Sequence, residues 1–93
     1  MKAVGKTTDG LVVVQGVGAL CFSKGVPLEV VLTYFQEQNL IVDWVDYITT
    51  AFNDGHNPRT IRARIDSAVS DVLGKDIACE IMIRTDKILE ILK

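Results

Sequence analysis

The sequence predicts a mostly α-helical protein that folds as a compact bundle of four to five short helices, in a single domain spanning residues 1–93. Three observations lead to this fold class. Apolar residues recur at helical spacing in three segments of the chain, and residue types typical of helix ends bound these segments. In addition, 48% of the 93 residues are hydrophobic, which suffices for one core without disulfides or metals.

The first predicted helix covers residues 26–39. Pro27 lies near its first position, where the missing N–H of proline does no harm. The apolar residues that follow recur at intervals of three and four positions: Leu28, Val31, Leu32 and Phe35. This spacing places them on one face, so the helix is predicted to be amphipathic.

The second predicted helix covers residues 43–54. Asp43 is a suitable N-cap, Asp46 lies in the first turn, and Gly55 ends the helix. Its apolar face consists of Trp44, Ile48, Ala51 and Phe52, with Val45 and Tyr47 at the edges.

The third predicted helix covers residues 58–73 and has the clearest boundaries. Asn57 caps it, Pro58 occupies its first position and Gly74 follows its last residue. Its apolar stripe is continuous: Ile61, Ile65, Ala68, Val69, Val72 and Leu73.

The N-terminal part of the chain fits two structures. Residues 11–22 are apolar nearly all round, so periodicity does not distinguish a buried helix from a buried strand. We favour a helix, since the segment is longer than a typical strand. The alternative is an α+β fold with a small N-terminal hairpin, in which Thr-Thr-Asp-Gly at residues 7–10 turns the chain after a strand at residues 2–5.

The C-terminal residues 76–93 also fit two structures. The spacing of Ile77, Ile81, Ile88 and Leu92 suits a helix, which we favour. The alternative is a C-terminal strand over residues 77–83 followed by a short helix.

Charge and cysteine content limit the class of protein. The formal net charge of −2 argues against a generally basic nucleic-acid binder and against a polybasic membrane binder. The apolar stretch at residues 11–22 is too short to span a bilayer and has no cleavage pattern of a signal peptide, so we expect a soluble cytoplasmic protein without a membrane partner. Cys21 and Cys79 are expected to be reduced, buried small hydrophobes.

No motif typical of catalysis or metal binding appears, so we expect neither an enzyme nor a cofactor. His56 is the single histidine, and a dyad with Cys21 or Cys79 is the catalytic alternative. Gly16 and Gly18 match the start of a dinucleotide-binding fingerprint, but Cys21 replaces its third glycine and we expect no βαβ unit after it. We interpret the two glycines as positions where another element packs closely.

Charge is distributed unevenly along the chain. Residues 26–57 contain five acidic residues and no Lys or Arg, whereas Arg59, Arg62 and Arg64 open the third predicted helix. The N-terminal end of a helix carries partial positive charge, so cations are unfavourable there. Arg62 can pair with Asp66 one turn on, which would relieve this in part. Either the arginines form a solvated face, or they meet an anion.

We therefore expect a small protein-interaction module, an adaptor, an inhibitor or a self-assembling protein, whose partner is another protein or a second copy of the chain. The expected partner-binding residues are Arg59, Arg62, Arg64, Asp43, Asp46 and Asp54. The alternative is a DNA-binding protein of the helix-turn-helix kind, with the helix that begins at Pro58 as its recognition helix. That alternative needs buried apolar residues at four positions that are polar here: Thr50, Asp54, His56 and Arg64.

Overall fold

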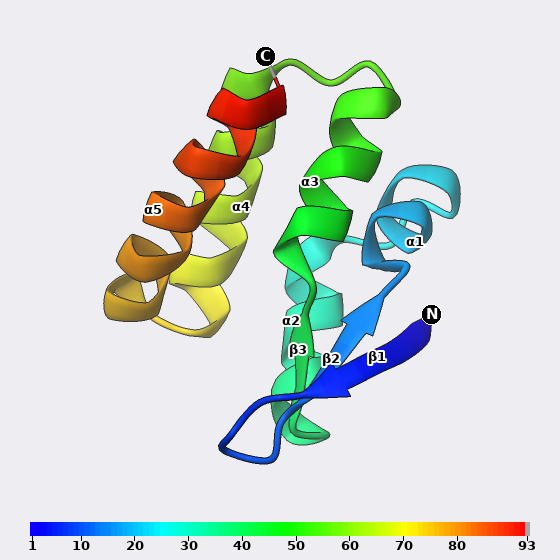
Figure 1. Ribbon diagram of the computed structural model, residues 1–93, viewed down its shortest axis with the longest axis vertical. Coiled ribbons are helices and arrows are strands. Elements are labelled where there is room, and N and C mark those ends of the chain that lie inside the picture. Colours follow the sequence, from blue (N-terminus) through cyan, green and yellow to red (C-terminus); the bar gives the residue numbers. More distant parts are fainter. Residues whose placement is uncertain (93) are drawn as a thin grey trace.

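The computed structural model describes residues 1–92, which form five helices and a three-stranded sheet (Figure 1). In chain order the elements are β1 (Lys2–Lys6), β2 (Val12–Gln15), α1 (Val17–Ser23), α2 (Leu28–Glu37), β3 (Leu40–Val42), α3 (Trp44–Asn53), α4 (Pro58–Val72) and α5 (Lys75–Leu92). The mostly helical prediction is confirmed. The small sheet at the N-terminal end also fits the α+β alternative.

The three helices with clear boundary residues are confirmed as α2, α3 and α4. The Asp43 carboxylate caps α3 by accepting from the backbone N–H of Asp46 at 3.2 Å, and the Asn57 side chain caps α4 by accepting from the N–H of Thr60 at 2.8 Å. Gly74 follows α4 with φ of 95°, a conformation that favours glycine. The predicted apolar faces are turned inward, but Tyr47 is 1% exposed and belongs to the core rather than to the edge of α3.

The helix predicted over residues 11–22 is wrong in its first part. Residues 12–15 are strand β2, and helix α1 begins only at Val17. The hairpin alternative is confirmed, because β1 pairs with β2 in antiparallel fashion and Thr7 accepts from the N–H of Gly10 in the turn. The β-branched run at residues 12–14 finds hydrogen-bond partners on both sides, which a periodicity argument along the chain does not reveal.

Helix α5 confirms the helical interpretation of the C-terminal segment, and the strand alternative over residues 77–83 is wrong. Its inward positions recur every three or four residues: Ala78, Met82, Thr85 and Leu89. Lys93 lies outside the described residues.

The sheet has the order β1-β2-β3, with β2 and β3 parallel. Strand β3 was not predicted, since three residues carry too little periodicity. Helices α1 and α2 form the connection that parallel pairing requires, so the expectation that no βαβ unit follows Gly16 and Gly18 is wrong. Figure 1 shows α3 rising from β3 beside the α4–α5 pair.

The core lies between the sheet and the helices and takes buried side chains from all five helices and from β2 and β3. Helix α4 packs mainly on α5 and α2, while α1 packs on α3. Gly18 allows the last of these contacts, because a Cβ placed on it would lie 2.8 Å from Cβ of Thr50. The interpretation of Gly18 as a position of close packing is confirmed.

We expect Gly18→Ala to lower the free energy of unfolding by about 1–3 kcal/mol, the usual cost of overpacking a rigid contact. Thermal or urea denaturation measures this loss. Gly5→Ala is the matched control, because a Cβ at Gly5 meets nothing within 4 Å, and it should leave stability unchanged. Equal stabilities of the two variants would contradict the close approach of α1 to α3.

Candidate functional site

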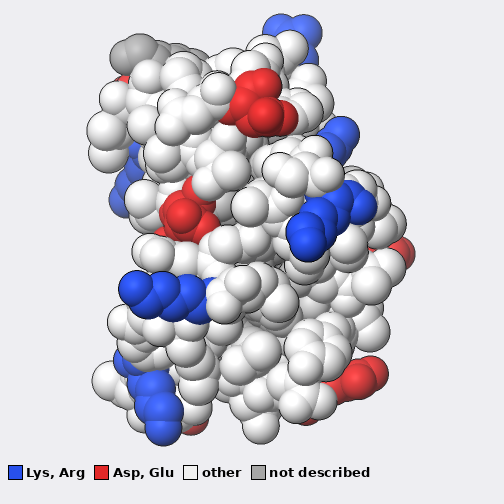
Figure 2. All heavy atoms as spheres, turned by 90° about the vertical axis from the view of Figure 1, so that its right-hand side faces the viewer, with Lys and Arg blue, Asp and Glu red and all other residues white. Residues whose placement is uncertain are grey.

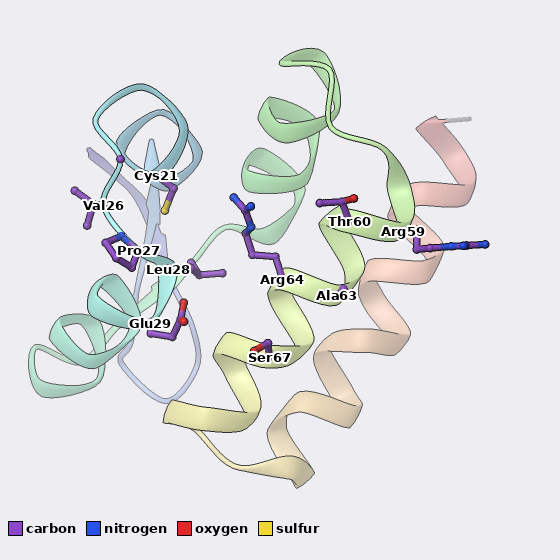
Figure 3. A pocket seen from close by; sticks show the side chains of 11 residues that line it. Cys21, Val26, Pro27, Leu28, Glu29, Arg59, Thr60, Ala63, Arg64 and Ser67 are labelled. Carbon is purple, nitrogen blue, oxygen red and sulfur yellow. The ribbon is translucent and has the colours of Figure 1, made fainter.

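The three arginines of α4 point to three different places. Arg62 donates from Nε to Oδ1 of Asp86 on α5 at 2.8 Å, and this hydrogen bond raises the pKa of its guanidinium. The predicted pairing of Arg62 with Asp66 is therefore wrong. In Figure 3, Arg64 points from α4 toward the segment that carries Cys21, whereas Arg59 extends the opposite way across α5. The arginines share a helix but do not form one cluster.

Arg64 lies in a groove between α4 and the segment that joins α1 to α2 (Figure 3). The groove has a volume of about 750 Å³. One wall comes from the end of α1, the loop and the start of α2, through Cys21, Val26, Pro27, Leu28 and Glu29; the other comes from α4, through Arg59, Thr60, Ala63, Arg64 and Ser67. The groove thus joins apolar surface to hydroxyl groups and one inward-pointing cation.

The Arg64 guanidinium has an aromatic neighbour but no carboxylate partner among residues 1–92. Its central carbon lies 6.0 Å from the ring centroid of Phe22, within the range of a cation–π contact. No ion pair to Arg64 is present in the described part of the chain, although Glu29 lines the facing wall. Arg64 is therefore held on one side and leaves its donors free toward the groove.

A cluster of aromatic side chains lies next to Arg64. The Phe22 ring lies 5.5 Å from that of Tyr47 and 4.6 Å from that of His56, centroid to centroid. His56 Nε2 lies 3.2 Å from Oδ2 of Asp54, so this carboxylate orients the imidazole. The cluster ties α1, α3 and α4 together at the end of the groove where Arg64 lies.

Tyr47 carries a buried hydroxyl that has no hydrogen-bond partner within residues 1–92. Burial raises the pKa of this phenol well above its usual value, and the negative charge of Cys21 would raise it further wherever that thiol ionises. Burial also raises the pKa of Cys21, and the positive charge of Arg64 opposes that shift. Both groups are therefore protonated near neutral pH.

We expect Tyr47→Phe to keep or increase the free energy of unfolding, because the variant removes a buried hydroxyl that has no partner and keeps the ring. Urea denaturation is the measurement. Tyr34→Phe is the control, since Tyr34 is 53% exposed and its hydroxyl lies in water. A loss above about 1 kcal/mol in Tyr47→Phe would show that the hydroxyl has a partner.

The acidic residues expected to bind a partner have contacts within the chain. The Asp43 carboxylate accepts from Nε2 of Gln15 at 3.0 Å in addition to capping α3, and Asp46 Oδ2 accepts from the N–H of Gly16 at 2.9 Å. Asp54 is exposed beside His56. The structure therefore gives Asp43 and Asp46 roles in joining the sheet to α1 and α3; binding of a partner by any of the three stays a prediction.

We expect Asp46→Ala to lower the free energy of unfolding by about 1–3 kcal/mol, because it leaves the Gly16 N–H without its charged acceptor. Asp71→Ala serves as the control: Asp71 is exposed near the C-terminal end of α4, where an acid gains nothing from the helix dipole. Thermal denaturation of both variants tests this, and an unchanged Asp46→Ala would contradict the assigned role.

The residues considered for catalysis do not come together in the described part of the chain. No hydrogen bond joins His56 to either cysteine, and Asp54 is its only ion-pair partner there. Both cysteines are free, as expected, but Cys79 is exposed and Cys21 is half-buried, so the expectation that both are buried is wrong. A nucleophilic cysteine needs a thiolate, whereas the raised pKa of Cys21 favours the thiol.

The glycine pair after β2 is not arranged for a phosphate. Gly16 is the N-cap of α1 and has a φ of 95°. Its N–H, which a phosphate would need, donates to the Asp46 carboxylate. Within residues 1–92, no group of three His, Cys, Asp or Glu side chains could hold a metal ion. No helix in that range is both long and apolar enough to cross a bilayer.

The helix-turn-helix alternative meets structural difficulties. Of its four critical positions, Asp54 and Arg64 are exposed, while Thr50 and His56 are only half-buried. Helix α4 packs far more on α2 and α5 than on α3, whereas a recognition helix is supported by the helix before it. On the face drawn in Figure 2, which is the right-hand side of Figure 1, basic side chains are scattered singly with acidic ones among them.

Comparison of the chain with protein-family models, with curated proteins and with solved structures found no match. The site is therefore defined by its own geometry. Sequence reasoning identified Arg64 but missed Phe22, Tyr47 and Glu29. The sequence did carry one signal for Phe22, which ends an apolar run just before Ser-Lys-Gly at residues 23–25.

Proposed function

We propose that this protein is a non-enzymatic protein-interaction module that binds an acidic segment of a partner protein in the groove between α4 and the α1–α2 loop. The observation that supports this most is the Arg64 guanidinium, which points into the groove and has no carboxylate partner within residues 1–92. A guanidinium held in place and left without an anion favours carboxylate binding, because its fork of N–H donors matches the two oxygens.

The remaining lining residues favour a peptide rather than an inorganic anion. Val26, Pro27 and Ala63 offer apolar surface beside Arg64, while the hydroxyls of Thr60 and Ser67 can accept or donate hydrogen bonds along α4. A segment that alternates acidic and apolar side chains would use both kinds of surface. Glu29 on the facing wall would repel a dense polyanion, so nucleic acid fits the groove less well.

The structure favours a different protein over a second copy as the partner. Self-association through the predicted charges would need Asp43 and Asp46, and both carboxylates already accept hydrogen bonds within the chain. Asp54 is the only one of the three acidic residues that is exposed, and it lies beside His56. An acidic segment from another chain does not compete with these contacts.

The test measures binding of a fluorescein-labelled peptide that alternates Glu and Leu, by fluorescence anisotropy. We expect Arg64→Glu to weaken binding at least about tenfold, the effect of losing one charged hydrogen bond and adding repulsion. Arg62→Glu is the matched control, because Arg62 faces α5 and not the groove. Thermal denaturation should show that both variants remain folded.

Three results would overturn the proposal. A Gln-Leu peptide that binds as tightly as the Glu-Leu peptide would remove the role of charge. Equal losses in Arg62→Glu and Arg64→Glu would place binding outside the groove. Tighter binding of duplex DNA than of the peptide, falling steeply with salt, would support the DNA-binding alternative instead.

A further inference from the structure

A second hollow lies away from the Arg64 groove, between the C-terminal half of α2, strand β3 and the first half of α5. Its volume is about 500 Å³, within the usual range of small-molecule sites. Apolar side chains from six parts of the chain line it, among them Leu32, Phe35, Trp44, Leu73, Ile77 and Ile81. We call it the apolar cleft.

The cleft exists because α2 and α5 both pack on α4 without closing on one another. Leu32 and Phe35, at 3% and 1% exposed, form its floor, whereas Ile77 at its rim is 41% exposed. Trp44, Leu73 and Ile81 are half-buried between them. Ile77 and these three half-buried residues keep apolar surface in contact with water, and an occupant that covers this surface would be stabilised.

The mouth of the cleft carries one positive and one negative side chain, which do not form an ion pair with each other in the described residues. Arg84 and Glu80 lie one helical turn apart on α5 and both line the cleft, yet no ion pair involves either of them among residues 1–92. The amides of Gln36 and Asn39 line the cleft from the α2 side. One free guanidinium with neutral amide donors suits a single carboxylate, and Glu80 disfavours a ligand with several negative charges.

We propose that the apolar cleft binds a single-chain amphiphile with one carboxylate, of the class of a medium-chain fatty acid. The alkyl chain lies between α2 and α5 against Leu32, Phe35 and Ile81, and the carboxylate accepts hydrogen bonds from Arg84. An alkyl chain is narrow and flexible, and the volume of about 500 Å³ is in the range of small-molecule sites. A partner helix is about 10 Å across with its side chains and needs a longer apolar groove.

Trp44 provides a direct readout, because it is the only tryptophan of the chain and lines the cleft. The experiment titrates the full chain with decanoate, decanol and decylamine below their micellar concentrations and records Trp44 emission. We expect a saturable change with decanoate, and weaker binding of decylamine. In Arg84→Gln, decanoate binding should weaken about tenfold while decanol binding stays the same.

Two further variants separate this site from its alternatives. Ile77→Gln alters the exposed rim and should weaken decanoate and decanol alike, with an unchanged fold by circular dichroism. Arg59→Gln removes a charge away from the cleft and should change nothing. Arg64→Glu should also leave decanoate binding intact, so the test is independent of the proposed peptide groove.

Several outcomes would overturn the proposal. The proposal fails if Trp44 emission shows no saturable change, or if the three ligands bind with equal affinity. It also fails if Arg84→Gln does not weaken decanoate binding. A ligand-free dimer in analytical ultracentrifugation that Ile77→Gln dissociates would also overturn it, since a second copy of the chain would then cover the cleft.

Discussion

The fold depends on two aspartates, Asp43 and Asp46, which join the β2–α1 junction to the β3–α3 junction. The parallel strands β2 and β3 end side by side, and each leads into a helix within two residues. Asp43 caps α3 and accepts from the side chain of Gln15, while Asp46 accepts from the N–H of Gly16. The carboxylates thus satisfy backbone and side-chain donors that would otherwise be left without partners where sheet, α1 and α3 meet.

This arrangement determines where the candidate site lies. With α1 held against α3 through Gly18 and Thr50, Phe22 at the end of α1 reaches Tyr47 and comes within cation–π range of Arg64. The α1–α2 loop then faces α4 across an open groove instead of packing on it. The groove and its guanidinium therefore follow from the docking of α1, although all three arginines belong to α4.

The two hollows differ in chemistry because α4 is amphipathic and central. Its apolar stripe supports both α2 and α5, so neither helix can close fully on the other, and this leaves the apolar cleft. Its polar side meets the α1–α2 loop, and this leaves the groove with Arg64. A small domain has a large surface relative to its volume, which agrees with the exposure of several large apolar residues here, such as Ile77 and Ile83.

The sequence by itself determined α2, α3, α4 and their caps, because helix periodicity and N-cap chemistry act within a few residues. It also placed three arginines, Arg59, Arg62 and Arg64, in the first turns of α4. Only the tertiary structure decided that residues 12–15 form a strand, that Arg62 pairs with Asp86, and that Asp43 and Asp46 face inward. Arg62 and the two aspartates each meet a partner more than twenty residues away. Strand β2 pairs with β3 at a similar separation, in addition to the nearby β1, and no local pattern specifies the pairing with β3.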